Sequence, residues 1–150
     1  MAKRSLVLET FLPYRLSYTS SLVSELIAGA YKSLFGLTIP EWRVIAHIAE
    51  ETGVTQQQIG QRSRMDKVTV SRAAISLIDR DLVARAQNPS DRRSHLLVLT
   101  VAGRVLYDQV APKALELEDQ VFERFDAQEL ALLEKMLRKI DASALAAIGN

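Results

Sequence analysis

Apolar residues recur at intervals of three or four along nearly the whole chain, and this spacing is interrupted only between residues 82 and 99. Such spacing places apolar side chains on one face of an α-helix. Residues 82–86 and 94–99 are instead typical of strands, and residues 87–91 between them are rich in turn formers. We therefore predict a mainly α-helical fold with one small β-hairpin.

Capping residues divide the helical part into segments. A first long helix is expected to begin near Pro13, since proline is tolerated in a first turn, and to end near Gly36. A second helix is expected from about Pro40 to near Gly53, a glycine suited to a left-handed helix end. Residues 55–58 contain a capping box of threonine and glutamine, which predicts the start of a short third helix.

A fourth helix is predicted to begin after Asp66, a good N-cap, and residues 62–65 separate it from the third. Its expected buried residues are Val70, Ala73, Ala74 and Leu77. Gly60 disfavours the third helix by about 1 kcal/mol relative to alanine, which suggests that the fourth helix crosses closely over it. Two short helices joined by a tight turn and followed by a β-hairpin form a winged helix-turn-helix.

Two more helices are expected after the hairpin, one from Val101 to about Phe125 and one opened by Asp126 with Glu129. The last helix carries an apolar stripe made of Leu130, Leu133, Leu137, Ile140 and Ala144. This stripe and the apolar first helix are candidate dimerisation surfaces, although part of the stripe is expected to pack within the chain. We therefore expect residues 1–36 and 101–150 to be dimerisation helices and residues 37–100 to be a DNA-binding lobe.

Composition excludes several classes of function. The 150 residues, 48% of them apolar and 25% charged, are typical of one globular domain. The absence of cysteine excludes a disulfide, a thiolate metal site, a cysteine nucleophile and sensing by thiol oxidation. Only two histidines are present, His47 and His95, and no Gly-x-Ser-x-Gly motif occurs. We expect no catalytic residues, no metal and no cofactor.

The apolar runs are too short to span a bilayer, and the N-terminus does not resemble a signal peptide. A cytoplasmic protein without a membrane partner is expected.

Positive charge is concentrated in the middle of the chain. Residues 62–93 contain eight basic and four acidic side chains, a net charge of +4, which leaves −3 for the rest of a chain whose total is +1. A basic segment in a chain that is otherwise acidic favours binding to a polyanion, because cations displace counterions from phosphates. The alternative is an ordinary solvated charged face.

The fourth helix and the hairpin tip carry the residues expected to contact DNA. Short side chains in the first turns of the helix allow it to enter the major groove, where Lys67 and Arg72 can reach phosphates or guanine edges. An arginine on the extended hairpin tip suits the narrow minor groove, and a neighbouring aspartate can hold its guanidinium. The predicted DNA-binding residues are Arg64, Lys67, Val68, Thr69, Ser71, Arg72, Asp91, Arg92 and Arg93. The alternative is a helical hairpin with solvated basic residues.

The run from Leu37 to Arg104 resembles the core of the MarR family of bacterial transcriptional regulators. The most specific part is the wing motif at 88–93, Asn-Pro-Ser-Asp-Arg-Arg, followed by Leu99, Thr100 and Gly103. The flanking long helices extend the resemblance to essentially the whole chain. Asn88 stands where the family usually has aspartate and Asp81 where it often has glycine, but both residue types tolerate turn or left-handed geometry.

The resemblance implies a homodimer whose first and last helices interlock, bound to a pseudo-palindromic operator near its own or a neighbouring promoter. It implies that Asp91 orients Arg93 for the minor groove and that Arg72 matches an arginine common in the recognition helix.

The resemblance also implies a small-molecule signal, since such regulators often bind aromatic acids in a cleft beside the dimerisation helices. Aromatic faces with one or two cations suit a planar carboxylate or an acyl-coenzyme A thioester. The candidate residues are Tyr14, Arg15, Tyr18, Trp42, Arg43 and His47. A structural role is the more common one for such residues, Trp42 in the core and His47 as a hydrogen-bonded structural histidine.

We therefore expect a repressor released from DNA by a small aromatic acid or its coenzyme A thioester. Two other readings stay open: a winged helix that contacts protein instead of DNA, and a small enzyme, for which the sequence offers no catalytic pair.

Overall fold

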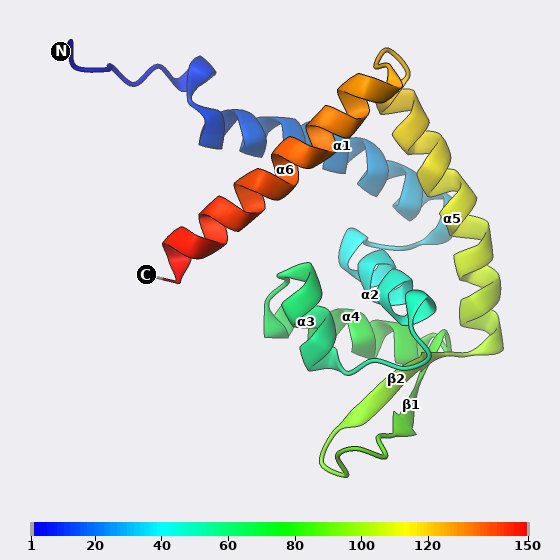
Figure 1. Cartoon of the computed structure of the whole chain (residues 1–150). Helices are drawn as coiled ribbons and strands as arrows, with labels where there is room; N and C mark the ends of the chain where they lie inside the picture. Colours follow the sequence, from blue (N-terminus) through cyan, green and yellow to red (C-terminus); the bar gives the residue numbers. More distant parts are fainter. Residues whose placement is uncertain (1, 150) are drawn as a thin grey trace. The chain divides into compact units, whose positions relative to one another are not determined.

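The computed structural model describes residues 2–149 and is mainly helical with one β-hairpin, as predicted (Figure 1). A short 3-10 helix, Leu8–Thr10, precedes all other elements. These are α1 (Leu12–Phe35), α2 (Ile39–Glu50), α3 (Gln56–Ser63), α4 (Lys67–Asp79), β1 (Val83–Gln87), β2 (His95–Leu99), α5 (Val101–Phe122) and α6 (Ala127–Ile148). The chain divides into two compact units, with the boundary inside α5 after Ala114.

Most helix ends follow the predicted caps. Gly36 ends α1 in the left-handed conformation, with φ 63°. The capping box formed by Thr55 and Gln58 opens α3, and the Asp66 side chain accepts a hydrogen bond from the backbone N–H of Thr69 at the start of α4. These caps use residues three apart in sequence, so local patterns are sufficient to find them.

The prediction for α2 is wrong at its C-terminus. The helix ends at Glu50 instead of near Gly53, and Gly53 does not have a positive φ. The chain extends early because Val54 forms an antiparallel bridge with Leu97 of β2, with N–O distances of 3.3 and 2.8 Å. A long-range pairing therefore overrides the local helix-end signal.

The hairpin pairs β1 with β2 antiparallel, from Val83 opposite Leu99 to Gln87 opposite His95. Both strands start one residue later than predicted. Leu82 belongs to the turn after α4, because its N–H donates to the Leu77 carbonyl oxygen and its own carbonyl oxygen accepts from Thr100. Ser94 belongs to the loop, where its hydroxyl accepts a hydrogen bond from the side chain of Asn88.

The core of the helix-turn-helix region is formed by apolar side chains from α2, α3, α4 and the hairpin. The fully buried residues include Val44, Ile45, Ile48, Ile59, Leu77, Val83 and Leu97. The predicted inner face of α4 is confirmed, since Val70, Ala73, Ala74 and Leu77 are all buried. This packing turns the opposite face of α4 outward.

The helix α6 has no buried residue. Its apolar stripe, which includes Leu130, Leu133, Leu137 and Ile140, is exposed. The prediction that part of this stripe packs within the chain therefore finds no support in the compact unit to which α6 belongs.

Over residues 2–149, no single helix is both long and apolar enough to cross a bilayer. The helices α1 and α2 meet the length and composition test only jointly, as a pair bent by 79°.

The structure corrects the explanation of Gly60. A Cβ at this position would lie 3.5 Å from the Met65 carbonyl oxygen and 3.9 Å from a Val70 methyl group, which are ordinary contacts. The helix α4 therefore does not require glycine there.

We predict that Gly60→Ala raises the free energy of unfolding by up to about 1 kcal/mol, because alanine restricts the unfolded chain and favours the helix. Chemical denaturation of the two proteins measures the difference. A destabilised variant would show that α4 crosses α3 more closely than the structure indicates.

Candidate nucleic-acid interface

The helix α4 presents its predicted contact residues outward. Lys67, Val68 and Arg72 are exposed, whereas Thr69 and Ser71 are half-buried. The Thr69 hydroxyl donates to Asp66 Oδ2 at 2.9 Å, so its hydrogen serves the helix cap and only its acceptor lone pairs and methyl group remain for a ligand. The pKa of Asp66 is lowered, first by the backbone N–H of Thr69 and then by this hydroxyl, so the cap stays ionised.

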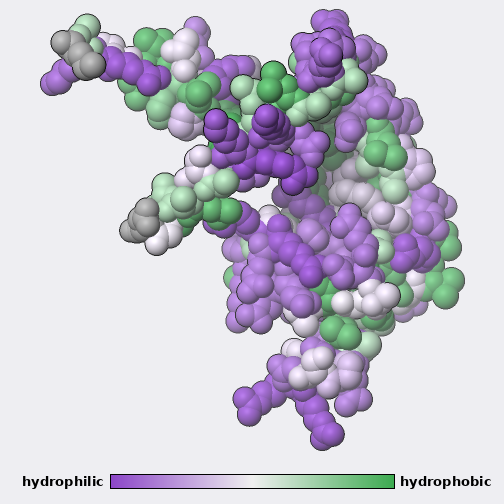
Figure 2. Space-filling model, viewed as in Figure 1, coloured by the Kyte–Doolittle hydropathy of each residue, from purple (hydrophilic) through white to green (hydrophobic). Residues whose placement is uncertain are grey.

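A groove of about 800 Å³ lies between α3, α4 and the hairpin. Four predicted residues from two separate segments line it: Lys67, Ser71, Asp91 and Arg93. The hairpin, or wing, lies beside α3 and α4 in Figure 1, and its tip is strongly hydrophilic in Figure 2. The fold therefore brings the start of α4 and the wing to one concave basic surface.

Sequence reasoning missed seven polar residues of this groove: Thr55, Gln56, Gln57, Gln61, Arg85, Ser94 and His95. The strand register contains the signal for two of them. Arg85 lies opposite Leu97, and His95 is two residues before Leu97, so the alternation of a strand puts both on the same face as this buried leucine. The glutamines lie on α3, which the prediction treated only as a support for α4.

The wing loop is organised by two side chains. Buried Asn88 accepts from the Ser90 N–H at 3.0 Å and donates to the Ser94 hydroxyl at 2.9 Å, which explains how asparagine serves at this position. Asp91 Oδ1 accepts from the backbone N–H of Arg93 at 2.9 Å. Within residues 2–149 no ion pair joins Asp91 to the Arg93 guanidinium, so Asp91 fixes the backbone of Arg93 and leaves its side chain exposed.

Among residues 2–149, two residues other than glycine have left-handed backbone conformations, Arg64 with φ 58° and Asp81 with φ 56°. Arg64 follows α3, where the Ser63 hydroxyl donates to the Ile59 carbonyl oxygen at 2.6 Å and accepts from the Met65 N–H at 3.2 Å. Asp81 follows α4, at the position where the resemblance implies that glycine is common. The left-handed conformation of a non-glycine residue costs about 1–2 kcal/mol.

We predict that Arg64→Gly and Asp81→Gly each raise the free energy of unfolding by about 0.5–1 kcal/mol, because glycine adopts this conformation without strain. If Arg64 contacts phosphate as predicted, Arg64→Gly also weakens DNA binding, whereas Asp81→Gly does not. Denaturation and duplex titration of both variants separate the two effects. If Arg64→Gly and Asp81→Gly bind the duplex with equal affinity, Arg64 does not contact DNA.

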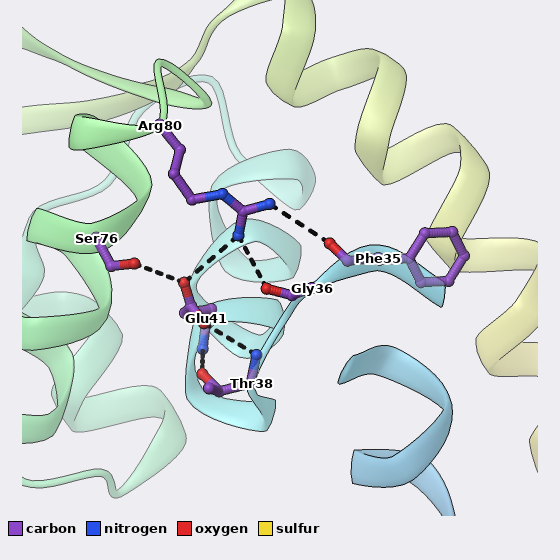
Figure 3. A network of polar contacts seen from close by, with 6 residues as sticks. All are labelled: Phe35, Gly36, Thr38, Glu41, Ser76 and Arg80. Atoms are coloured by element: carbon purple, nitrogen blue, oxygen red, sulfur yellow. Dashed lines mark hydrogen bonds and ion pairs between the residues drawn. The ribbon is translucent and has the colours of Figure 1, made fainter. Parts of the chain in front are cut away.

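A polar network centred on Glu41 holds the C-terminal end of α4 (Figure 3). Glu41 is 7% exposed and its Oε1 accepts from the Thr38 N–H at 2.9 Å. Its Oε2 accepts from the Ser76 hydroxyl of α4 at 2.8 Å and lies 3.8 Å from a guanidinium nitrogen of Arg80. Arg80 also donates to the Gly36 carbonyl oxygen at 3.1 Å. The network therefore joins the end of α1, the start of α2 and α4.

The Glu41 carboxyl is held ionised by this network. Burial raises its pKa, but hydrogen bonds from Thr38 and Ser76 and the charge of Arg80 outweigh burial and lower the pKa below its ordinary value. The ionised carboxylate therefore stabilises the folded state above the ordinary carboxyl pKa, and this contribution is lost as the pH falls through the lower folded-state pKa.

We predict that Glu41→Gln reduces stability at pH 7 by about 1–3 kcal/mol, because a charged acceptor in a buried network is lost. We also predict that it weakens the decline in stability between about pH 5 and pH 3. Denaturation at each pH measures both effects. An unchanged pH profile would mean that Glu41 does not contribute to the acid sensitivity of the fold.

The structure separates the predicted effector residues into two groups. Near the start of α1, the Tyr14 and Tyr18 rings lie 6.1 Å apart, and the Arg15 guanidinium lies 5.3 Å from the Tyr18 ring. Trp42 packs instead against Tyr31, which is thirteen residues after Tyr18 on the same helix. Thirteen helical residues span about 20 Å, so the two groups do not line one cleft within a subunit.

Trp42 belongs to an aromatic cluster that sequence reasoning missed. Its ring stacks on Tyr107 of α5 at 5.6 Å and 15°, and it lies 5.6 Å from buried Tyr31 at 60°. The Arg104 guanidinium lies 5.5 Å from the Tyr107 ring. Burial raises the pKa of Tyr31. Of the other predicted residues on α2, Arg43 is exposed and His47 is half-buried. The described residues contain no cluster of His, Asp or Glu suited to a metal ion.

Comparison with known proteins gives consistent matches. Residues 35–94 match the MarR family. The chain is 25% identical over 104 residues to the transcriptional regulator HosA of Escherichia coli O111:H-, a match that covers 69% of this chain and 77% of HosA. The crystal structure of a MarR/EmrR family regulator from Acinetobacter sp. ADP1 superposes with a TM-score of 0.85 at 24% identity, covering 93% of this chain and 98% of that one. CouR from Rhodococcus jostii RHA1, bound to p-coumaroyl-CoA, superposes with a TM-score of 0.81 at 25% identity, covering 91% and 95%.

The helix pair α3 and α4 with its basic hairpin forms a winged helix-turn-helix, which confirms the predicted fold. Residues 35–94 match the MarR family, and the matched relative HosA is a transcriptional regulator, so the chain is similar to MarR family transcriptional regulators.

Proposed function

We propose that this regulator binds a pseudo-palindromic operator as a homodimer and represses transcription until a small molecule releases it. The groove between α4 and the wing carries the proposal, because Lys67, Ser71 and Arg93 line one concave surface although they lie in separate segments. Residues 37–100 would form the DNA-binding lobe, and residues 1–36 and 101–150 the dimerisation region. Since the target is chromosomal DNA, the protein would act in the cytoplasm.

Exposed apolar surface supports the homodimer. Figure 2 shows apolar side chains open on the outer surface of α1, where Leu12, Leu16, Leu22 and Leu26 are exposed. The helix α6 exposes eight large apolar side chains: Leu130, Leu132, Leu133, Met136, Leu137, Ile140, Leu145 and Ile148. Large contiguous apolar surfaces mark protein interfaces. A two-fold dimer would cover these faces and present two copies of α4 about one DNA turn apart.

Selection from a random duplex pool at about 0.15 M salt tests the DNA-binding part of the proposal. We expect enrichment of an inverted repeat whose half-sites lie about 10 base pairs apart and which is bound by two chains. The absence of any sequence preference over random competitor would overturn the proposal and favour a winged helix that contacts protein.

For the effector we propose a planar aromatic carboxylate or its coenzyme A thioester. The stacked rings of Trp42 and Tyr107 offer aromatic faces, and Arg104 beside them offers a cation for an anionic group. Arg43 and His47 lie on the same helix as Trp42. Tyr14, Arg15 and Tyr18 would reach the same ligand only from the second subunit. The acyl-coenzyme A bound to CouR supports this ligand class by similarity.

Trp42 is the only tryptophan, so its fluorescence reports on this cluster without interference from other indoles. Titration with aromatic acids and their coenzyme A thioesters is expected to quench Trp42 and to release the selected duplex over the same concentration range. Arg104→Ala should weaken both responses. Release without a change in Trp42 fluorescence would place the effector elsewhere.

A further inference from the structure

His95 lies in the groove between α3, α4 and the hairpin, outside the wing motif at residues 88–93. It is the first residue of β2, it is exposed, and it lies opposite Gln87. It lines the groove together with Lys67 of α4 and Arg85 of β1. Within residues 2–149, no hydrogen bond or ion pair engages its imidazole. The ring is therefore free to meet a ligand that enters the groove.

The charged side chains that line the groove together with His95 are Lys67, Arg85, Arg93 and Asp91. With three cations and one carboxylate, the groove carries a net positive charge that suits an anionic ligand. A DNA phosphate reverses the local potential and favours the protonated imidazole, which then donates a charge-assisted hydrogen bond. Histidine is the side chain whose ordinary titration range makes such an exchange possible near neutral pH.

We propose that His95 is a DNA-backbone contact of the wing and that each subunit takes up a proton at this residue when it binds the duplex. This inference rests on the proposed DNA-binding function. It adds a residue outside the wing motif and makes operator affinity depend on pH.

Fluorescence anisotropy with the selected duplex between pH 8 and pH 6, at constant ionic strength and without effector, tests the proposal. Affinity is expected to rise as the pH falls, by at most about tenfold per pH unit for each proton taken up. His95→Gln should remove the rise. His95→Lys, which carries a fixed charge, should bind at pH 8 more tightly than His95→Gln and without pH dependence.

The salt dependence gives a second readout. If each protonated His95 neutralises one phosphate, the slope of log affinity against log salt becomes steeper at pH 6 than at pH 8 by about 0.9 per subunit. His95→Gln should show the same slope at both pH values. A role limited to folding of the hairpin would not change this slope.

His47→Gln is the matched control because it removes the only other histidine and lies on α2, away from the groove residues. It should keep the pH response whatever its absolute affinity. Specific duplex binding that does not change with pH, or a pH response that survives in His95→Gln, would overturn the inference and leave the proposed function intact. Loss of specific binding at every pH in the wild-type protein would overturn both.

Discussion

Gly103→Ala is expected to lower the free energy of unfolding by about 3 kcal/mol, the largest effect on stability that we predict. A Cβ at Gly103 would overlap the carbonyl oxygen of Leu82, and the same carbonyl accepts a hydrogen bond from the Thr100 N–H at 3.1 Å. Gly103 also donates its N–H to the Thr100 hydroxyl at 3.0 Å. Because these contacts are with backbone or with a capping side chain, the overlap cannot be relieved by a rotamer change and α5 must move.

Chemical denaturation measures the free energies of unfolding of Gly103→Ala and Gly60→Ala, and their comparison tests this prediction. The same substitution is expected to destabilise at Gly103 and to stabilise at Gly60, where an added methyl group meets only ordinary contacts. A Gly103→Ala protein as stable as the wild type would show that the start of α5 does not lie against Leu82.

Arg93→Ala is expected to weaken operator binding by at least about 30-fold, the largest functional effect that we predict. Each lost contact of this kind costs about 1–3 kcal/mol, and a two-fold complex loses it twice. The Arg93 side chain is exposed, while Asp91 bonds only its backbone N–H. The substitution should therefore leave folding and dimerisation unchanged.

Arg62→Ala is the control for net charge. Arg62 pairs with Glu51 at 2.8 Å on an exposed part of the surface, and it does not line the groove. Exposed ion pairs of this kind contribute little to stability. A loss of affinity for Arg62→Ala equal to that for Arg93→Ala would mean that overall charge, not the wing geometry, drives binding.

Local patterns were sufficient to predict the elements that depend on neighbouring residues. The caps at Thr55, Asp66 and Asp126 and the buried face of α4 are as expected because each involves residues three or four apart. The end of α2 was not predictable in this way, since the bridge between Val54 and Leu97 joins residues 43 apart in sequence.

In the candidate sites, too, some residues could be found from local sequence patterns and others only from the tertiary structure. The wing arginines and Lys67 could be identified from charge and motif, whereas Arg85 and His95 become groove residues only through the register of the hairpin. The cluster of Tyr31, Trp42 and Tyr107 draws on α1, α2 and α5, so no single segment of sequence contains its pattern. Whether a position requires glycine also depends on the tertiary structure. A Cβ would make ordinary contacts at Gly60 but would overlap the Leu82 carbonyl oxygen at Gly103.

Dimethyl sulfate protection of the selected duplex tests the central claim most directly, because the reagent methylates guanine N7 in the major groove and adenine N3 in the minor groove. With α4 in two major-groove segments and Arg93 in the adjoining minor grooves, we predict two N7-protected stretches about 10 base pairs apart. Each should be accompanied by protected adenine N3 positions that become reactive in Arg93→Ala. Protection confined to one stretch, or minor-groove reactivity unaffected by the protein, would contradict a homodimer that reads DNA with α4 and the wing together.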